Sequence, residues 1–423
     1  GAPLLDDPVD LKLDVLADPA GLVTLHVLEV KASLGTVAAK GTFDTIAGRL
    51  DMAVDAEIPT LGEPLLPGAD VQGLNFAGRV SGLVEELQAV GKLRIAKATT
   101  DAAMVGGLAV DADVRVSPGK VGFAIKGNAA ELLADRLNMT EGGPVTLDVA
   151  GVLDGERLTL EKADVASALL TASASGEADL GGGLVNLDYK AEASDLAPVA
   201  TAYDAVAGGA FLVEGQVSGK LQEPLIEGIA ALRQPSLDGK PIGDVELQHN
   251  VTLGEAISGT AVVRAVTKPY GKVSADTAFR LQGDQLTVSK LQANGLGVSA
   301  GSKGPVTVDL ASTLVEGLLQ WKAASLEGIG RVAGTALAGA GNGSLKLHLI
   351  EGKQAADLVA SIARLRAGDA AIESVKLEAA VRDVLDEMPG LRAKVKAQGV
   401  AAGGVELPVV NATANGTLKA LNV

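Results

Sequence analysis

Residues 155–160 read GERLTL, and the same pattern returns 128 positions later as GDQLTV at residues 283–288. Each copy is followed by a Lys and then by a run rich in Ser, Ala and Leu. A second pair, GRVSG at 78–82 and GQVSG at 215–219, repeats with a shift of 137. Long-period self-similarity made of short strands and glycines predicts a solenoid or an extended sheet. Such proteins present a surface or groove along their length and seldom house one catalytic pocket.

Short stretches that alternate apolar and polar residues recur along the chain, with the period of a half-buried β-strand. The clearest are residues 11–15, 110–116, 185–190, 245–248, 306–310 and 345–349. Turn signals rich in Gly, Asp and Pro separate them, which favours sequential antiparallel pairing. We therefore expect an all-β fold, namely an elongated, curved antiparallel sheet of repeated units. The sheet is expected to contain about 25–30 strands.

Three segments have helical features. Residues 128–139 begin with Asn128 as a candidate N-cap and carry Glu131 three residues later. Residues 195–206 are expected to form a short helix. Residues 355–366 have apolar residues at helical spacing, but strand-like sequence flanks them, so helix and strand both stay open. So few helices cannot cover the apolar face of a long sheet, and that face must therefore be occupied by something else.

Composition supports a thin sheet. Hydrophobic residues make up 47% of the 423 residues, but aromatic residues only 2%. A compact core of this size would use more aromatic volume, whereas a sheet lined with small aliphatic residues does not need it. The 53 glycines supply turns and bulges. The high aliphatic content argues against intrinsic disorder.

The balance of 36 basic and 52 acidic residues gives a net charge of −16. This argues against nucleic acid as a partner and against docking on anionic lipid through a polybasic patch. The absence of Cys excludes disulfides and thiolate sites. No run approaches the ~20 apolar residues of a transmembrane helix. Any membrane anchor is therefore expected in segments outside this chain.

Candidates for chemistry are isolated. His26, His249 and His348 are far apart in strand-like contexts, and ordinary structural roles are expected for them. The glycines at 181–183 lack the spacing of a phosphate loop. Trp321, the lone tryptophan, is expected to pack on the inner face. We therefore expect no enzyme activity, no catalytic or metal-binding residue and no cofactor.

The order of elements in the central part of the chain resembles a known repeat. A strand ending in GEAD (176–179) leads to an alternating strand, a short DLAP stretch (195–198) and an Ala/Gly-rich segment. The sequence EGQVSGKLQEP (214–224) follows, and then a Leu-Asp-Gly turn. This resembles the repeat unit of the TamB family, the inner-membrane subunits of the translocation and assembly module. These are AsmA-like, bridge-like lipid transfer proteins.

Weaker copies begin near Gly41 and Ser302, so the resemblance spans nearly the whole chain. We expect three groove repeat units, at residues 1–140, 141–280 and 281–423, within one continuous elongated domain. The resemblance implies a U-shaped "β-taco" in the periplasm of a Gram-negative bacterium. The full-length protein would be anchored in the inner membrane, and the concave face would form a continuous apolar groove.

Two functions follow from that resemblance. The first is to carry phospholipid acyl chains between the inner and outer membranes, in support of outer-membrane biogenesis. The second is to guide β-strands of outer-membrane or autotransporter proteins, together with the Omp85-type partner TamA. A secreted β-helix adhesin is a third alternative from the repeats alone.

The groove is expected to be lined by the apolar phase of the clearest strands. Its predicted lining residues are Leu11, Leu13, Val15, Val110, Val114, Val185, Leu187, Val245, Leu247, Val306, Val308, Leu345 and Leu347.

Overall fold

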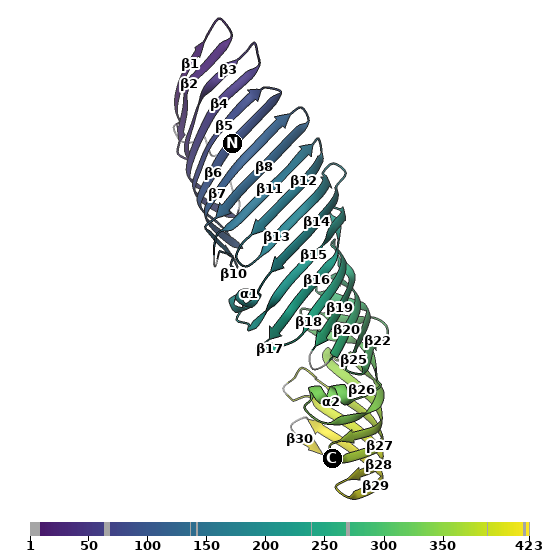
Figure 1. The fold of residues 1–423 in the computed structure, drawn as a ribbon. Helices are drawn as coiled ribbons and strands as arrows, with labels where there is room; N and C mark the ends of the chain where they lie inside the picture. Colours follow the sequence, from purple (N-terminus) through teal and green to yellow (C-terminus); the bar gives the residue numbers. More distant parts are fainter. Residues whose placement is uncertain are drawn as a thin grey trace. The chain divides into compact units, whose positions relative to one another are not determined.

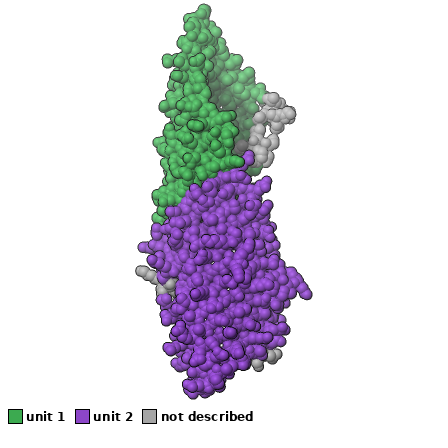
Figure 2. Space-filling view, turned by 90° about the vertical axis from the view of Figure 1, so that its right-hand side faces the viewer, with its two compact units in different colours: residues 1–221 green, residues 222–423 purple. Residues whose placement is uncertain are grey.

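The structure, a computed structural model, describes residues 9–62, 68–135, 137–140, 143–237, 239–267, 271–386, 388–417 and 420–422. The chain divides into two compact units, unit 1 over Gly1–Leu221 and unit 2 over Gln222–Val423 (Figure 2). Each unit is an antiparallel sheet whose successive strands lie side by side (Figure 1). The expected all-β antiparallel fold with few short helices is confirmed.

Unit 1 is a row of long strands joined mostly by short turns. Its described elements are β1 (Asp10–Ala17), β2 (Leu22–Ala32), β3 (Gly35–Asp44), β4 (Arg49–Leu61), β5 (Ala69–Leu83), β6 (Glu86–Thr100), β7 (Ala103–Ser117), β8 (Lys120–Ala129), β9 (Glu131–Ala134), β10 (Leu137–Asn138), β11 (Val145–Asp154), β12 (Arg157–Ala166), β13 (Thr171–Asp179), β14 (Leu184–Ala193), α1 (Ala197–Ala202) and β15 (Ala207–Lys220). Strands β1 to β8 pair in sequence order, β8 pairs with β11, and the order continues to β15.

Unit 2 has the same plan. Its described elements are β16 (Glu223–Leu237), β17 (Lys240–Pro241), β18 (Asp244–Thr252), β19 (Ile257–Thr267), β20 (Gly271–Gln282), β21 (Gln285–Gly295), β22 (Val298–Ser302), β23 (Val306–Asp309), β24 (Leu314–Ala323), α2 (Glu327–Val332), β25 (Leu337–Ile350), β26 (Lys353–Ala367), β27 (Ala370–Arg382), β28 (Gly390–Ala402), β29 (Val405–Thr417) and β30 (Ala420–Asn422). The short strands β22 and β23 together bridge β21 and β24.

Every pairing given for the described strands is antiparallel. A β-helix of the kind considered for an adhesin stacks parallel strands instead. The adhesin alternative therefore lacks the fold it requires.

The repeated sequence motif forms a bulged strand. In β12, Leu160 pairs with Gly151 and Lys162 with Ala150, so that Glu161 is an extra residue. In β21, Val288 pairs with Phe279 and Lys290 with Ala278, which leaves Ser289 extra. The Lys after each copy of the motif thus lies at a β-bulge, a device that bends a strand and increases its twist.

A third bulged strand is β2, where Leu25 pairs with Gly41 and Leu28 with Ala39. Its sequence, LVTLHVL from Leu22 onward, contains the same Thr-Leu step as the copy in β12. The repeat therefore has three structural copies, one more than the motif comparison found. The division into three domains at 1–140, 141–280 and 281–423 stays a prediction.

The two helices occupy equivalent places. Helix α1 follows β14 and α2 follows β24, and both come before a long strand. The backbone N–H of Leu196 donates to Gly209 O (2.8 Å), and the N–H of Leu326 donates to Gly339 O (2.9 Å), a shift of 130 residues in both donor and acceptor. The helix predicted within 195–206 is confirmed. Helix α2 was not predicted.

The helix predicted over residues 128–139 is wrong. Strand β8 continues to Ala129, and residues 131–138 contain the hairpin of β9 and β10, although Arg136 lies outside the described residues. Ala129 pairs with Val145 of β11, and Glu131 pairs with Gly106 of β7. Pairing with these neighbouring strands overrides the local capping pattern. The ambiguous segment 355–366 is strand β26, which is paired along both edges.

Two glycines opposite the bulges permit close approach of neighbouring strands. Gly41 pairs with Leu25 and Gly176 with Leu160, the residues that precede the bulges in β2 and β12. Gly176 has φ +139°, and a Cβ there would lie 2.2 Å from Asn186 O. A residue with a side chain would therefore push β13 away from β14.

Gly176→Ala is expected to destabilise unit 1 by roughly 1–3 kcal/mol, because the new methyl group meets a backbone oxygen and the φ is unfavourable. The measurement is the midpoint of denaturant unfolding followed by circular dichroism. Gly122→Ala in β8 is the matched control, since a Cβ at Gly122 meets no atom within 4 Å. Equal midpoints for the two variants would contradict the close-approach role.

Candidate functional site

The strand register divides each sheet into an apolar and a polar face. Residues directly opposite each other in antiparallel strands point to the same face, and the next residue along points to the other. The pairings therefore connect side chains into rows that run across the strands. Two adjacent rows in unit 1, one residue apart on each strand, show how complete the division is.

The first row, called here the apolar row of unit 1, contains no charged residue across thirteen strands. Its members are Leu13, Leu28, Ala39, Val54, Gly78, Gly91, Ala112, Ile125, Val149, Ala163, Ala174, Tyr189 and Gly215.

The adjacent row, the polar row of unit 1, carries charge on most strands. Its members are Lys12, Glu29, Ala38, Asp55, Ala77, Lys92, Asp111, Lys126, Asp148, Asp164, Ser173, Lys190 and Glu214. Opposite charges meet across strands: Lys92 Nζ is 3.5 Å from Asp111 Oδ1, and Lys126 Nζ is 3.7 Å from Asp148 Oδ2. Such exposed pairs add little stability, but they mark this face as the one that faces water.

Unit 2 repeats the arrangement. Its apolar row is Ala230, Leu247, Val263, Ala275, Ala293, Ala300, Trp321, Gly343, Ala360, Leu377, Val395 and Ala412. The adjacent row contains Glu246, Arg264, Lys322 and Lys376, with Arg264 Nη1 3.8 Å from Glu246 Oε1. Both units therefore have one uncharged face and one charged face.

The register places all thirteen predicted lining residues on the apolar face of their own unit. Leu13 and Leu247 belong to the apolar rows, and the other eleven lie two or four residues from a row member or pair with a residue of the same face. Leu11, Leu13 and Val15 are exposed, at 64%, 59% and 48%, whereas Val185 and Val306 are buried. The rest are half-buried.

Little within the described residues covers these faces. Helix α1 contacts β15 and helix α2 contacts β25, and each has only six residues. No large side chain there is less than 2% exposed. The accessible surface is 25,129 Å². Two globular proteins of half the mass of this 42.4-kDa chain would together expose about 18,000 Å². The excess means that a dry core of normal size is missing.

The apolar face is nevertheless the more shielded one. Along β14, residues 185, 187, 189, 191 and 193 are half-buried or buried, whereas 184, 186, 188, 190 and 192 are exposed. Side chains converge on the concave side of a curved sheet and diverge on its convex side, so this difference marks the apolar face as concave in β14. Unit 1 is hollowed in the view of Figure 2. Burial also raises the pKa of the Tyr189 phenol.

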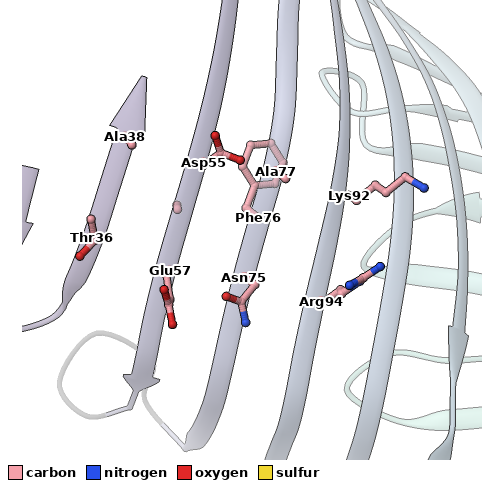
Figure 3. Close-up of a pocket in the computed structure, with 10 residues that line it drawn as sticks. Thr36, Ala38, Asp55, Glu57, Asn75, Phe76, Ala77, Lys92 and Arg94 are labelled. Carbon is pink, nitrogen blue, oxygen red and sulfur yellow. The ribbon is translucent and has the colours of Figure 1, made fainter. Parts of the chain in front are cut away.

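The polar face has shallow depressions of its own. One of about 410 Å³ in unit 1 is lined by Asp55 and Glu57 of β4, Asn75 of β5, and Lys92 and Arg94 of β6 (Figure 3). Its acidic groups lie on β4 and its basic groups on β6, and neither sign of charge dominates. It therefore offers neither an apolar lining nor an anion cradle, and we assign it no ligand.

The remaining polar groups have structural roles. A hydrogen bond from Lys162 lowers the pKa of Asp148, and a hydrogen bond from Arg79 lowers that of Asp51. His348 lies 3.6 Å from Asp357 on the polar face. His249 lies on the apolar face opposite Ala261, and His26 is exposed at the bulge of β2. Among the described residues, no three His, Asp or Glu side chains are placed to hold a metal ion.

One buried polar side chain replaces missing backbone pairing. Gln354 of β26 is 5% exposed. Its Oε1 accepts from Val315 N (2.7 Å), and its Nε2 donates to Val315 O (2.9 Å). The pairing given for β24 and β25 begins only at Gly317, so the amide of Gln354 satisfies the backbone of β24 before that point.

A scan against protein-family models finds no match, and a search of curated proteins also finds none. In the part of the chain that the structure describes, no helix combines the length and apolar character needed to cross a bilayer.

The division into faces predicts a sharp change in polarity between neighbouring positions. The chain has no cysteine, so Leu187→Cys and Asp188→Cys can each carry one polarity-sensitive fluorophore. Emission from position 187 is expected to be shifted to the blue of emission from position 188, because Leu187 lies on the shielded apolar face and Asp188 is exposed. Identical emission maxima would show that the faces do not differ in solution.

Proposed function

We propose that this chain is part of a periplasmic, bridge-like protein that carries phospholipid acyl chains along an apolar groove between the inner and outer membranes. The observation that carries the proposal is the uncharged row across successive strands in each unit, with little protein covering it. Acyl chains would supply the missing core volume. Their burial is favourable by about 0.8 kcal/mol per methylene.

The chemistry of the two faces also suggests how a phospholipid would bind. The apolar rows contain no basic group that could hold a phosphate, and the charged groups lie on the opposite face. Acyl chains would therefore enter the groove while head groups stay at its solvent-exposed rim. Resemblance to the TamB repeat points to the same class of cargo.

A second candidate is the guidance of unfolded β-strands of outer-membrane proteins with an Omp85-type partner such as TamA. The observation that favours it is β1, whose eight residues are all exposed and which pairs with β2 along its length. Among the described residues the only pairing given for β1 is with β2, and an added strand could pair with its other edge. Lys12 and Asp14 on β1 are of the kind that discourages unselective pairing.

A charge on the apolar face is expected to remove lipid. Leu187→Arg in unit 1 and Val308→Asp in unit 2 should each lower the phospholipid that co-purifies with the chain. Displacing two methylenes costs about 1.6 kcal/mol, roughly a tenfold loss of local affinity. The measurement is lipid mass spectrometry with an internal standard.

The matched controls place the same charges one residue away, on the polar face: Asn186→Arg and Thr307→Asp. Both should retain the lipid content of the unaltered protein. Equal loss in the controls would mean that the charge disturbs the sheet and not the groove. Unaltered protein with no bound phospholipid would reject the proposal outright, and bound outer-membrane protein segments would then favour the second candidate.

Several phospholipids per chain are expected, with a head-group distribution close to that of the host membrane. The reason is that the apolar rows offer aliphatic contact without a polar group to select a head group. Comparison of co-purified lipids with the total lipid pool of the host measures this. One enriched species at one copy per chain would indicate a closed, specific pocket.

A further inference from the structure

Three aromatic side chains on the apolar faces lie against glycines of the same face. In unit 1, a Cβ at Gly78 would be 2.6 Å from Phe76 Cζ, and a Cβ at Gly91 would be 2.6 Å from Phe76 Cε2. Carbon atoms in contact are 3.5–4.0 Å apart. The ring of Phe76 can therefore occupy its position only because both residues are glycine.

The register explains how one ring reaches two glycines. Phe76 and Gly78 are two residues apart on β5, and Gly91 of β6 is directly opposite Gly78. Side chains in strands normally stand away from the sheet. Here the ring instead leans along β5 and over the Gly78–Gly91 pair. Asn75 and Ala77, on either side of Phe76, belong to the polar face (Figure 3).

The same device recurs in other strands and in the other unit. A Cβ at Gly151 would lie 2.8 Å from Phe123 Cζ, and one at Gly343 would lie 2.7 Å from Trp321 Nε1. Both rings are directly opposite their glycines in the register. With only nine aromatic residues in the chain, three placed in this way are a substantial fraction. Trp321 thus lies on the apolar face, as expected from the sequence.

We propose that the Phe76–Gly78–Gly91 cluster forms a low aromatic plate that sets the depth of the apolar face and on which an acyl chain rests. The proposal rests on the proposed function and deepens it by assigning residues that contact the acyl chain. Val54 and Ala112 flank the plate in the apolar row. The ring covers the bare glycine backbone without standing up into the space that an acyl chain needs. Phe123–Gly151 and Trp321–Gly343 are further plates of the same kind.

A side chain at Gly78 would force the ring off the sheet and into that space. The test uses Ala112→Cys, labelled with a fluorophore, and a phospholipid with a quenching nitroxide on its acyl chain, supplied in vesicles. Leu187→Cys is a second reporter, seven strands away by sheet order from Gly78. Gly78→Leu is expected to remove most of the quenching at position 112 and to leave quenching at 187 unchanged.

The controls separate obstruction from damage. Ala77→Leu adds bulk on the polar face and should leave both reporters quenched. Phe76→Ala/Gly78→Leu, in which the added side chain takes the place of the ring, should restore quenching at 112. If Gly78→Leu does not fold, Gly91→Ala places a single methyl group against the same ring and should give a partial loss.

Two failures are distinguishable. Unaltered protein without quenching at either reporter would overturn the proposed function itself. Quenching at both reporters that Gly78→Leu and Gly91→Ala leave unchanged would keep the lipid-binding face but overturn the plate, since the ring would then be only a filler over the glycines.

Discussion

The structure depends on the two-residue period of paired β-strands. Because neighbouring residues point to opposite faces, a one-residue slip in register would move every apolar side chain of a strand to the charged face. In unit 1 the uncharged row through Gly78 and Ala112 is adjacent to a row that carries Lys92 and Asp111. Register is strongly specified under these conditions, even though aromatic packing is scarce and no large side chain among the described residues is fully buried.

The bulges show how that constraint is met over long strands. In β12 the apolar face is formed by Leu158 and Leu160, but after the bulge by Ala163 and Val165. The apolar positions thus change from even to odd numbers, and the extra residue absorbs the change. Strand β21 makes the same switch, and β2 makes the opposite one, from odd numbers (Leu25) to even numbers (Leu28). A bulge therefore allows the strand to bend while the same chemistry stays on the same face.

Much of the strand pattern, and of the division into two faces, could be predicted from the sequence. Strict alternation predicted the strands, and it predicted which face each of the thirteen apolar positions lies on. It could do so because a polar side chain marks one face of such a strand and an apolar side chain marks the other. The change of phase between Leu160 and Ala163 was also readable and would have revealed the bulges. Helix α2 was missed, although it occupies the same place as α1, because SLEG at 325–328 shares little sequence with DLAP at 195–198.

Other features depend on contacts that a single sequence does not contain. The segment 128–139 has a good helix start, but β7 and β11 offer it backbone partners, and strand pairing prevails. The contact of Phe76 with Gly91 joins residues that only the register brings together. The same is true of the amide of Gln354, which bonds Val315 across an intervening strand. The alternation of residues along each strand predicted which face a side chain lies on, whereas the contacts within a face depend on how the strands pair.

Few side chains are buried, and the charged residues lie on one face of each sheet. The two features have one physical explanation in common. A sheet that buried its apolar face under helices would need larger side chains to fill the layer between them, and its aromatic content would rise. This chain instead uses mainly Gly, Ala and Val in its apolar rows and places three of its aromatic rings against glycines. Small side chains leave room above the sheet, and the charged opposite face keeps the protein in water. Both properties suit a surface whose covering layer comes from a bound apolar molecule, and the stability of the protein would then rise with the concentration of that molecule.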